Sequence, residues 1–283
     1  MATQNYAAKT LALIDERFAL EAKTEMLVNN GILLDFSGVN SVTIYNINTV
    51  AENDYVRTGT NRFGALVELG DGVETFVFSQ DKSFTFTVDR GNLEDSMMVQ
   101  EANKSVKRQI REVSIPATDT YTISVADAYA VANSQGTTGA MTSSNAFAAV
   151  LTQRAAMINA LVPVEDMVIV MSGGFEQVLF LDTTYKLASN LAYQDNQAAN
   201  NGASLVGKVA GMTAMVLPDS YLPANFNFLI IAKNVLVRPM KFQSVRILTD
   251  VQGIDGAVAE GRRYYDVFIP TNKGVAIRYH HTS

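Results

Sequence analysis

The stretch from residue 76 to residue 113 constrains the fold most, because its hydrophobic period changes partway along. From Phe76 to Val88 apolar residues occupy alternate positions, and Thr, Ser and Asp fill most of the others. A period of two predicts one long, half-buried strand. After Gly91 the spacing lengthens to four or five residues, which predicts an amphipathic helix. The stripe of this helix consists of Leu93, Met97, Ala102, Val106 and Ile110.

An earlier strand is predicted at about Val39–Val50. More than twenty residues without a clear apolar period separate it from the strand that contains Phe76. Compact domains rarely contain so long a connection without a use for it. The connection is marked by glycines and arginines, namely Arg57, Gly59, Arg62, Gly64, Gly70 and Gly72. We interpret it as an arm that projects from the body and contacts neighbouring molecules.

The helix at about 92–113 has clear signals at both ends. Asn92 is a favourable N-cap, with Asp95 three residues later, as in a capping box. Pro116 is expected to end the helix. Its basic residues gather late, where the helix dipole favours them: Lys104, Lys107, Arg108 and Arg111. They could form a nucleic-acid patch, but a solvated helix face is the favoured interpretation.

The middle of the chain alternates between helical and strand patterns. Ser144 or Asn145 is expected to cap a helix that Pro163 ends. The apolar run 168–171 predicts a buried strand, and Ser172-Gly173-Gly174 predicts a turn into another helix near 175–180. Together these elements indicate an α/β subdomain of roughly 120 residues.

The two ends of the chain carry their own patterns. Residues 6–28 are rich in Ala, Leu, Lys and Glu, which predicts an N-terminal helix that Asn29-Asn30-Gly31 ends. Near the other end, 264–270 and 275–279 flank Thr271-Asn272-Lys273-Gly274, which predicts a hairpin.

Composition excludes several classes of function. The 283 residues are 48% hydrophobic, carry a net charge of −6 and include no cysteine. The last point excludes disulfides, thiol nucleophiles, iron–sulfur clusters and zinc–thiolate sites. We find no secretory signal and no apolar run that would predict a membrane span, so we expect synthesis in the cytoplasm. The acidic balance argues against binding to nucleic-acid phosphates.

No catalytic, cofactor-binding or metal site is predicted. The only histidines, His280 and His281, lie near the C-terminus and are expected in a solvated tail, so a serine triad lacks a base. Ser172 lacks the G-x-S-x-G context of a nucleophile elbow. Gly207-Lys208 lacks the spacing of a phosphate-binding loop, and residues 250–255 offer too few ligands for calcium.

Five segments together resemble a known family. They are IDERFALEAKT (14–24), VNSVTIYNINTVAENDYVRTGTNRFG (39–64), FSQDKSFTFTVDRGNLEDSMM (78–98), RQIREVSIPATDTYTIS (108–124) and YYDVFIPTNKGVAIRYH (264–280). They resemble the major capsid proteins of tailed bacteriophages, which share the Hong Kong 97-type shell fold. The resemblance implies an α+β fold and a structural protein rather than an enzyme.

The family implies four parts for this chain. They are an N-terminal arm (1–36), an extended two-stranded loop called the E-loop (37–90), a peripheral domain with a long spine helix (91–117 and 239–283) and an α/β axial domain (118–238). Such proteins assemble as pentamers and hexamers into icosahedral shells around double-stranded DNA. An acidic protein fits a container to which DNA does not adhere.

The resemblance also implies partners and a location. Some members carry a cleaved scaffold segment before the arm; here the arm begins almost at once, so we expect a separate scaffolding protein. A portal protein is a further expected partner, and no cofactor or membrane is. The expected location is the virion capsid, assembled in the host cytoplasm.

In the family the E-loop lies near the spine helix of an adjacent subunit. We therefore expect Arg57 and Arg62 of the loop to meet Glu94, Asp95 and Glu101 of that helix. Two alternatives remain open. A nanocompartment shell of the same fold, similar to an encapsulin, would hold protein cargo; an enzyme would use the α/β part.

Overall fold

The computed structural model describes residues 23–29, 31, 34–36, 40–47, 49–68, 70–89, 105–185, 205–249, 251–253 and 256–282. The chain divides into two compact units. We call residues 31–79 the loop unit, and residues 1–30 with 80–283 the body. Each unit is described by itself.

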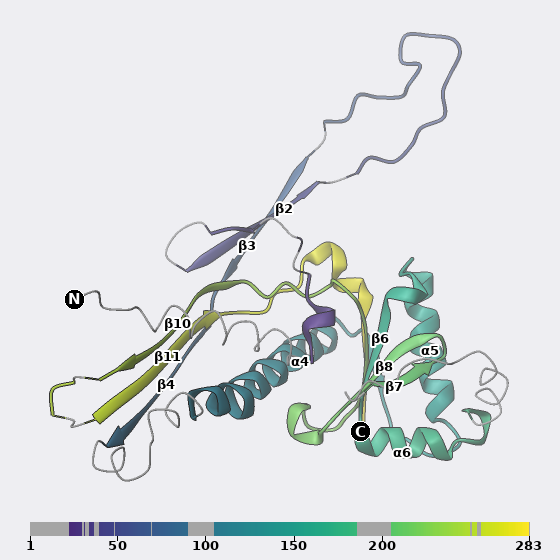
Figure 1. Cartoon of the computed structure of the whole chain (residues 1–283). Helices are drawn as coiled ribbons and strands as arrows, with labels where there is room; N and C mark the ends of the chain where they lie inside the picture. Colours follow the sequence, from purple (N-terminus) through teal and green to yellow (C-terminus); the bar gives the residue numbers. More distant parts are fainter. Residues whose placement is uncertain are drawn as a thin grey trace. The chain divides into compact units, whose positions relative to one another are not determined.

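The loop unit contains a small antiparallel sheet in the order β1-β2-β3. Its strands are β1 (Leu34–Asp35), β2 (Ser41–Ile47) and β3 (Asp71–Val77). Ser41 pairs with Val77 at one end of the ladder, and Ile47 pairs with Asp71 at the other. Beyond this last pair the chain makes a long excursion through residues 48–70 (Figure 1). The predicted strand at 39–50 and the long connection after it are both confirmed.

The predicted single strand from Phe76 to Val88 is wrong, because two strands share that stretch. β3 ends at Val77 and pairs with β2, whereas β4 (Gln80–Asp89) pairs with β11 in the body. Phe78 and Ser79 separate the two strands. The alternation gives no sign of this break, because Phe84 lies an even number of positions after Phe76 and the apolar parity is therefore preserved.

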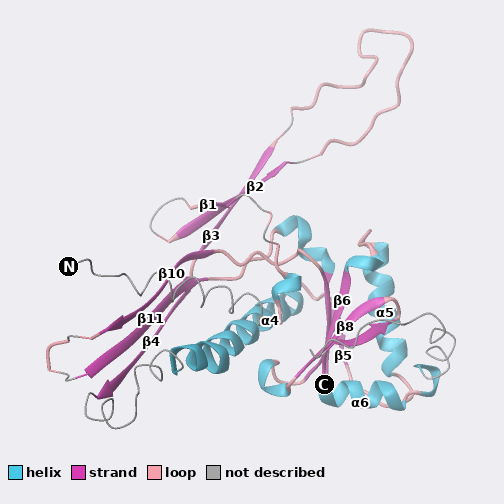
Figure 2. Ribbon diagram, in the orientation of Figure 1, coloured by secondary structure: helices cyan, strands magenta, loops and turns pink. Residues whose placement is uncertain are grey.

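The body contains two sheets. The smaller one is antiparallel, in the order β10-β11-β4, with β10 at Met240–Leu248 and β11 at Gly256–Tyr265. A long helical segment lies beside this sheet (Figure 2). It comprises residues 105–109, a π-helical turn at Ile110–Ser114 and helix α4 at Ile115–Ala132.

Pro116 does not end this helix, contrary to the prediction. It lies in the first turn of α4, where a residue without an N–H group is tolerated. The π-helical turn directly before it replaces the regular i to i−4 pattern. The helical path therefore continues past the proline, and residues 105–132 form one helical segment.

The long helix contributes to two hydrophobic cores. The buried members of the smaller core, next to the three-stranded sheet, are Val106, Ile110, Ile115, Val245 and Ala259. Further along, Ile123, Ala126 and Ala130 belong to the larger core of the α/β part. The predicted stripe is confirmed at Val106 and Ile110; Leu93, Met97 and Ala102 lie outside the described residues.

The larger sheet has six strands in the order β5-β12-β9-β6-β8-β7. Their bounds are β5 Gly136–Thr138, β6 Met167–Ser172, β7 Leu205–Val209, β8 Met212–Leu217, β9 Phe226–Ala232 and β12 Ile277–His281. Every residue of β6 and β9 is buried, so these central strands form the middle of the core. β7 and β8 are joined through Ala210 and Gly211, both with positive φ, as a two-residue hairpin turn requires.

Two helices of the α/β part confirm their predicted signals. Helix α5 (Ala146–Asn159) follows the N-cap Asn145, and helix α6 (Gly173–Leu181) follows Ser172. The Phe175 backbone N–H donates to the Ser172 hydroxyl at 3.1 Å. Ser172 is therefore a capping residue at a strand-to-helix turn.

The predicted C-terminal hairpin is wrong. β11 lies in the three-stranded sheet and β12 in the six-stranded sheet, where it pairs with β9 and β5. The 3₁₀ helix η6 (Thr271–Ala276) connects them, so the turn-forming residues lead from one sheet to the other. Other 3₁₀ helices within the described residues are η1 Glu25–Leu27, η3 Val164–Asp166 and η5 Asp219–Tyr221.

The described end of the N-terminal segment is held against α4 by a buried carboxylate. Asp119 on α4 accepts hydrogen bonds from the Thr24 hydroxyl at 2.7 Å and from the Lys23 backbone N–H at 3.1 Å. Arg238 donates to the Thr24 hydroxyl and to Glu25, and Val28 forms a parallel bridge with Leu236. Most of the predicted helix at 6–28 lies outside the described residues.

Candidate interaction surface

The long loop between β2 and β3 is almost entirely open to solvent. From residue 49 to residue 68, every residue is exposed except Gly64. Such a stretch has almost no side-chain burial within this chain to order it. Low burial of this kind is typical of segments with low local stability.

Large apolar side chains are concentrated in the loop unit. Among the described residues, ten of the twenty exposed large hydrophobics belong to it. They are Phe36, Tyr45, Val50, Tyr55, Val56, Phe63, Leu66, Val67, Val73 and Val77. Two of them are extreme, since Phe63 is 84% exposed and Leu66 is fully exposed. Exposed apolar side chains gathered in one region mark a binding surface for another macromolecule.

The tip of the loop has a small structure of its own. The Val56 backbone N–H donates to the Arg62 carbonyl at 2.9 Å, and Gly59 between them has a positive φ of 100°. The Arg62 guanidinium turns back and donates to the Gly59 carbonyl at 3.2 Å. The rings of Tyr55 and Phe63 meet edge to face with centroids 5.0 Å apart. The tip thus presents a formed turn with an aromatic pair beside it.

The predicted contact residues are only partly described. Arg57 and Arg62 are exposed near the tip of the loop. Glu94, Asp95 and Glu101 lie outside the described residues. The charge pairing between loop and helix therefore stays a prediction. The sequence analysis did not predict the exposed apolar side chains of the loop unit, although Phe63, Leu66 and Val67 are apolar residues within the predicted connection.

The two histidines do not form a solvated tail; that prediction is wrong. Both belong to β12, a strand paired on both sides in the six-stranded sheet. His280 is buried, stacks on Phe228 with ring centroids 5.3 Å apart, and its Nδ1 lies 3.1 Å from the Asn227 side-chain nitrogen. Burial, and then the neighbouring His281, lower the pKa of His280.

His281 is paired with a buried carboxylate. Its Nε2 lies 2.8 Å from Oδ1 of Asp127 on α4. Burial raises the pKa of Asp127, and the charge of His281 and its hydrogen bond oppose that rise. The pair joins the last strand to the long helix. Its partners come from distant parts of the sequence, so no local pattern could have revealed it.

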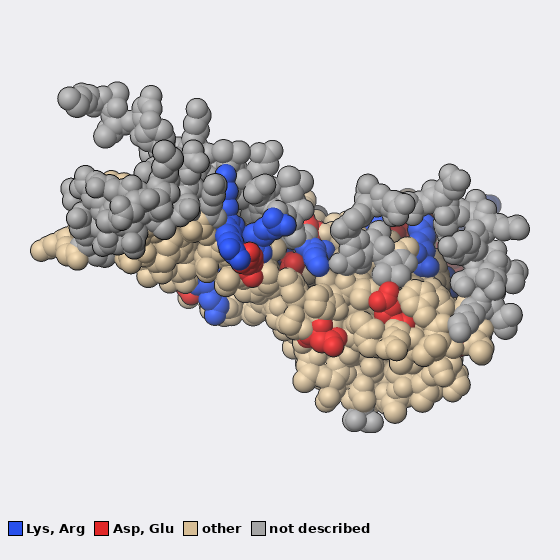
Figure 3. All heavy atoms as spheres, turned by 60° about the horizontal axis from the view of Figure 1, so that its bottom comes forward, with Lys and Arg blue, Asp and Glu red and all other residues tan. Residues whose placement is uncertain are grey.

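On the face shown in Figure 3, the charged side chains of the described residues are of both signs. In that view, Lys and Arg of the described residues form a small group near the middle beside acidic side chains. The broad surface at the lower right is mostly uncharged, with a few Asp and Glu. Within the described ranges there is no cluster of His, Asp and Glu suited to a metal ion. None of the helices described is long and apolar enough to cross a membrane.

No family model and no curated protein matches this sequence. Solved structures do match. In the head structure of Helicobacter pylori bacteriophage KHP40, a chain aligns over 93% of this chain and 90% of its own length, with 10% identity and a TM-score of 0.62. A chain in the capsid structure of the cyanophage P-SCSP1u aligns over 93% of this chain and 88% of its own length, with 11% identity and a TM-score of 0.60. A chain of the mature capsid of bacteriophage PhiM1 aligns over 87% of this chain and 82% of its own length, with 11% identity and a TM-score of 0.56. At these identities the likeness is one of fold: the chain has the mixed α and β fold of phage head and capsid proteins, as the sequence resemblance predicts.

Proposed function

We propose that this chain is a major capsid protein, a structural rather than catalytic protein that self-assembles as pentamers and hexamers into an icosahedral shell around double-stranded DNA. The observation that carries the proposal is the loop unit. It exposes half of the large apolar side chains that are exposed in the described chain, in a fold shared with phage capsid proteins. A repeated contact between copies would bury these side chains.

The proposal assigns roles along the chain as the family resemblance implies them. Residues 1–36 are the N-terminal arm, 37–90 the E-loop, 91–117 and 239–283 the peripheral domain, and 118–238 the axial domain. A long loop between paired strands supports the E-loop assignment, and the helix at 105–132 supports a spine helix. The partners under this proposal are other copies, a scaffolding protein and a portal protein; the product is a virion capsid built in the host cytoplasm.

Electron microscopy of the purified chain tests the proposal directly. Expressed alone, and then with the scaffolding protein of the same genome, the chain is expected to form capsomers or closed particles of megadalton mass. Size-exclusion chromatography with light scattering measures the mass, and negative staining shows the geometry. A chain that remains a monomer at high concentration with the scaffold present would exclude a shell protein.

The contents of the particles separate a capsid from a nanocompartment of the same fold. Particles isolated from infected cells are expected to carry nuclease-protected double-stranded DNA, with an absorbance ratio at 260 and 280 nm typical of nucleic acid. Particles that instead contain a second folded protein and no DNA would identify a protein-cargo shell.

A further inference from the structure

Helix α5 has an uncharged outer face. Its exposed apolar residues recur at intervals of three or four, the spacing of one helical face: Ala148, Leu151, Ala155 and Ile158. Another side of the helix, which includes Val150 and Met157, is buried in the larger core. Within the body the helix contacts α6 and β12 (Figure 1). A helix on the surface of a soluble protein normally presents charged residues on the side away from its core, so this face needs an explanation.

Leu161 extends the same apolar surface beyond the end of α5. The Leu161 backbone N–H donates to the Ile158 carbonyl at 2.9 Å, and the Val162 N–H donates to the Met157 carbonyl at 3.1 Å. This Schellman motif places Leu161 in the left-handed conformation, with a φ of 64°, at a position where glycine is usual. Its side chain is 91% exposed. The chain therefore keeps a leucine where its backbone is strained and its side chain is not buried, which points to a role outside its own fold.

The neighbouring helix surface also lacks exposed charge. We call Ala148, Leu151, Ala155, Ile158 and Leu161 the α5 stripe. The only charged residues of α5 and α6, Arg154 and Glu176, are both half-buried. The exposed residues of α6 are all uncharged: Gly173, Gly174, Gln177, Phe180 and Leu181. Because α5 contacts α6, the uncharged surface continues from one helix to the other, and the nearest exposed charge after the α5 stripe in the sequence is Glu165 of η3.

Charge indicates what covers this surface. The chain carries a net charge of −6, so two copies repel each other except where the surfaces that meet are uncharged. Interfaces between identical subunits are apolar in their core and depleted of charged residues there. DNA, in contrast, is bound through Lys and Arg that neutralise its phosphates, and the α5 stripe contains neither. The chemistry of the stripe fits a second copy of this chain.

We propose that the α5 stripe is a contact surface for a second copy of this chain, with Leu161 as the side chain that the second copy buries. The proposal rests on the proposed shell function and deepens it, because it assigns a contact between copies to the body in addition to the loop unit. Burial of Leu161 in the assembly offsets the strain of its backbone.

Cysteine labelling of the full chain tests whether a second copy covers the stripe. The sequence has no cysteine, so Ile158→Cys and Ser134→Cys each introduce a single thiol. Ser134 is the matched control, since it is exposed, has a φ of 53° and ends α4 in the same hydrogen-bond motif. In monomers both thiols should react with a maleimide. In capsomers or particles the thiol at position 158 should react at least about tenfold more slowly, and the control should not change.

Replacement of Leu161 by asparagine separates a contact residue from a structural one. Asparagine tolerates the left-handed conformation, so the midpoint of thermal unfolding of monomeric Leu161→Asn should equal or exceed that of wild type. The protein concentration needed for assembly, measured by light scattering, should rise at least about tenfold, because one leucine side chain per copy is no longer buried. Ser134→Asn relieves the same kind of strain outside the stripe and should leave that concentration unchanged.

The outcomes distinguish this contact from the shell proposal. If wild type forms no capsomers or particles, both proposals fail. If it does form them, but the thiol at position 158 reacts as fast as in monomers and Leu161→Asn assembles like wild type, the shell proposal stands and the contact through α5 is excluded. Protection already present in monomers would mean that another segment of this chain covers the stripe. Protection that disappears when a scaffolding protein is extracted would identify the scaffold as the occupant. Either result would overturn the contact between copies.

Discussion

The body and the loop unit use the same kinds of residue in opposite ways. In the body, whole strands such as β6 and β9 are buried. In the loop unit, residues 49–68 are exposed apart from Gly64, and they include Phe63 and Leu66. Burying one large apolar side chain contributes about 1.5–3 kcal/mol. The body gains this free energy within one chain, whereas the exposed apolar side chains of the loop unit gain little of it there.

The hydrogen bonds of polar side chains show the same contrast between the two units. Asp182 in the body is 1% exposed, and its carboxylate accepts from the backbone N–H groups of Phe147, Thr184 and Tyr185. It thereby ties the start of α5 to the end of α6. At the loop tip, Arg62 meets only the Gly59 carbonyl among the contacts of its guanidinium described here. Substitutions in the body should therefore change unfolding, and substitutions in the loop should change assembly.

Removal of the loop is expected to have the largest effect. Residues 48–70 can be replaced by Asn-Gly, because Ile47 and Asp71 are directly paired and a two-residue turn joins such strand ends. The free energy of unfolding of the body should change little, since loop length contributes weakly to it. Assembly should be abolished, as measured by light scattering and electron microscopy. Normal shells from this variant would show that the loop is not an interface element.

A charge placed in the smaller core tests whether substitutions in the body change the free energy of unfolding. Val106 is fully buried with Ile110 and Ile115, so Val106→Asp leaves an unpaired carboxylate there. We expect a loss of at least about 3 kcal/mol in the free energy of unfolding, and insoluble protein. The control is Val131→Asp on α4, where the side chain is 43% exposed and should cost less than about 1 kcal/mol. Soluble, assembling Val106→Asp protein would mean that the helix faces the sheet with another side.

Local signals predicted the α/β part of the body well. The residues before α5 and α6, Asn145 and Ser172, and the apolar run of β6 are signals local to the sequence, which explains why α5, β6 and α6 were predicted. Errors arose where distant partners decide the structure. The pattern from Phe76 to Val88 does not reveal that its first half pairs with β2 and its second half with β11. The pattern of residues 264–279 likewise does not reveal that the two strands belong to different sheets.

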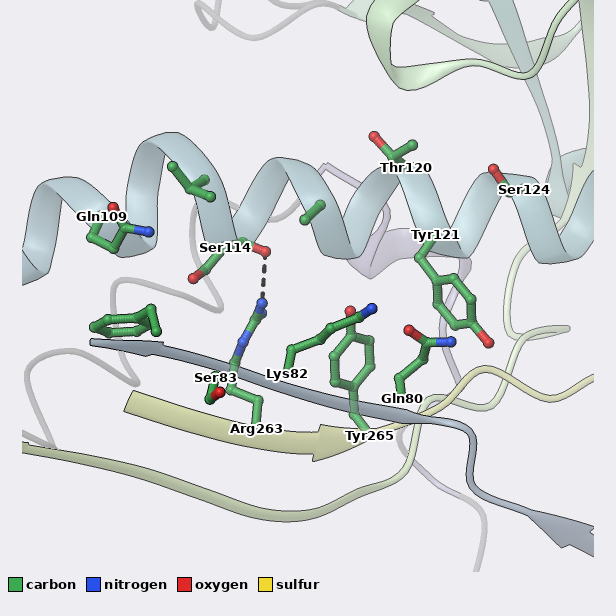
Figure 4. Close-up of a pocket in the computed structure, with 13 residues that line it drawn as sticks. Gln80, Lys82, Ser83, Gln109, Ser114, Thr120, Tyr121, Ser124, Arg263 and Tyr265 are labelled. Atoms are coloured by element: carbon green, nitrogen blue, oxygen red, sulfur yellow. Dashed lines mark hydrogen bonds between the residues drawn. The ribbon is translucent and has the colours of Figure 1, made fainter. Parts of the chain in front are cut away.

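The position of the candidate surface was predicted from the sequence, but its apolar character was not. The length of the connection after β2 indicated an arm, but the predicted contact residues were its arginines rather than its apolar side chains. The pairing of Lys82 with Arg263 could not have been predicted, because it joins residues far apart in the chain (Figure 4). Only the register of β4 against β11 brings the two cations together.

The carboxylate of Asp182 allows a smaller test of the body, with a pH dependence. Desolvation raises the pKa of Asp182, but hydrogen bonds from the N–H groups of Phe147, Thr184 and Tyr185 and from the Thr184 side chain outweigh it, so the pKa lies below its ordinary value. Asp182→Ala should lower the free energy of unfolding by about 1–3 kcal/mol at neutral pH. A lowered folded-state pKa stabilises the protein above the unfolded-state pKa, and this contribution is lost as the pH falls through the folded-state value.

The difference between wild type and Asp182→Ala should therefore shrink as the pH falls below about 3.9, the ordinary aspartate value. Chemical denaturation at a series of pH values measures it. Asp219→Ala, which removes an exposed carboxylate, provides the control and should change stability little at any pH. A difference that stays constant down to low pH would mean that the charge of Asp182 is not what the three N–H groups stabilise.

The smallest expected effect belongs to the charges of the loop. Arg57 and Arg62 are exposed, and an exposed ion pair contributes only about 0.2–1 kcal/mol, so a single substitution should be tolerated. Under the shell proposal every copy repeats the contact with Glu94, Asp95 and Glu101, which makes small contributions matter. Arg57→Glu with Arg62→Glu should leave unfolding unchanged but slow assembly at low salt. Near 1 M salt, where the Debye length falls to about 3 Å, the repulsion is screened and assembly should partly recover. Arg57→Lys with Arg62→Lys keeps both charges and serves as the control in light scattering across the salt series. If the reversed variant assembles like wild type at every salt concentration, the exposed apolar side chains hold the loop to its partner without help from the arginines.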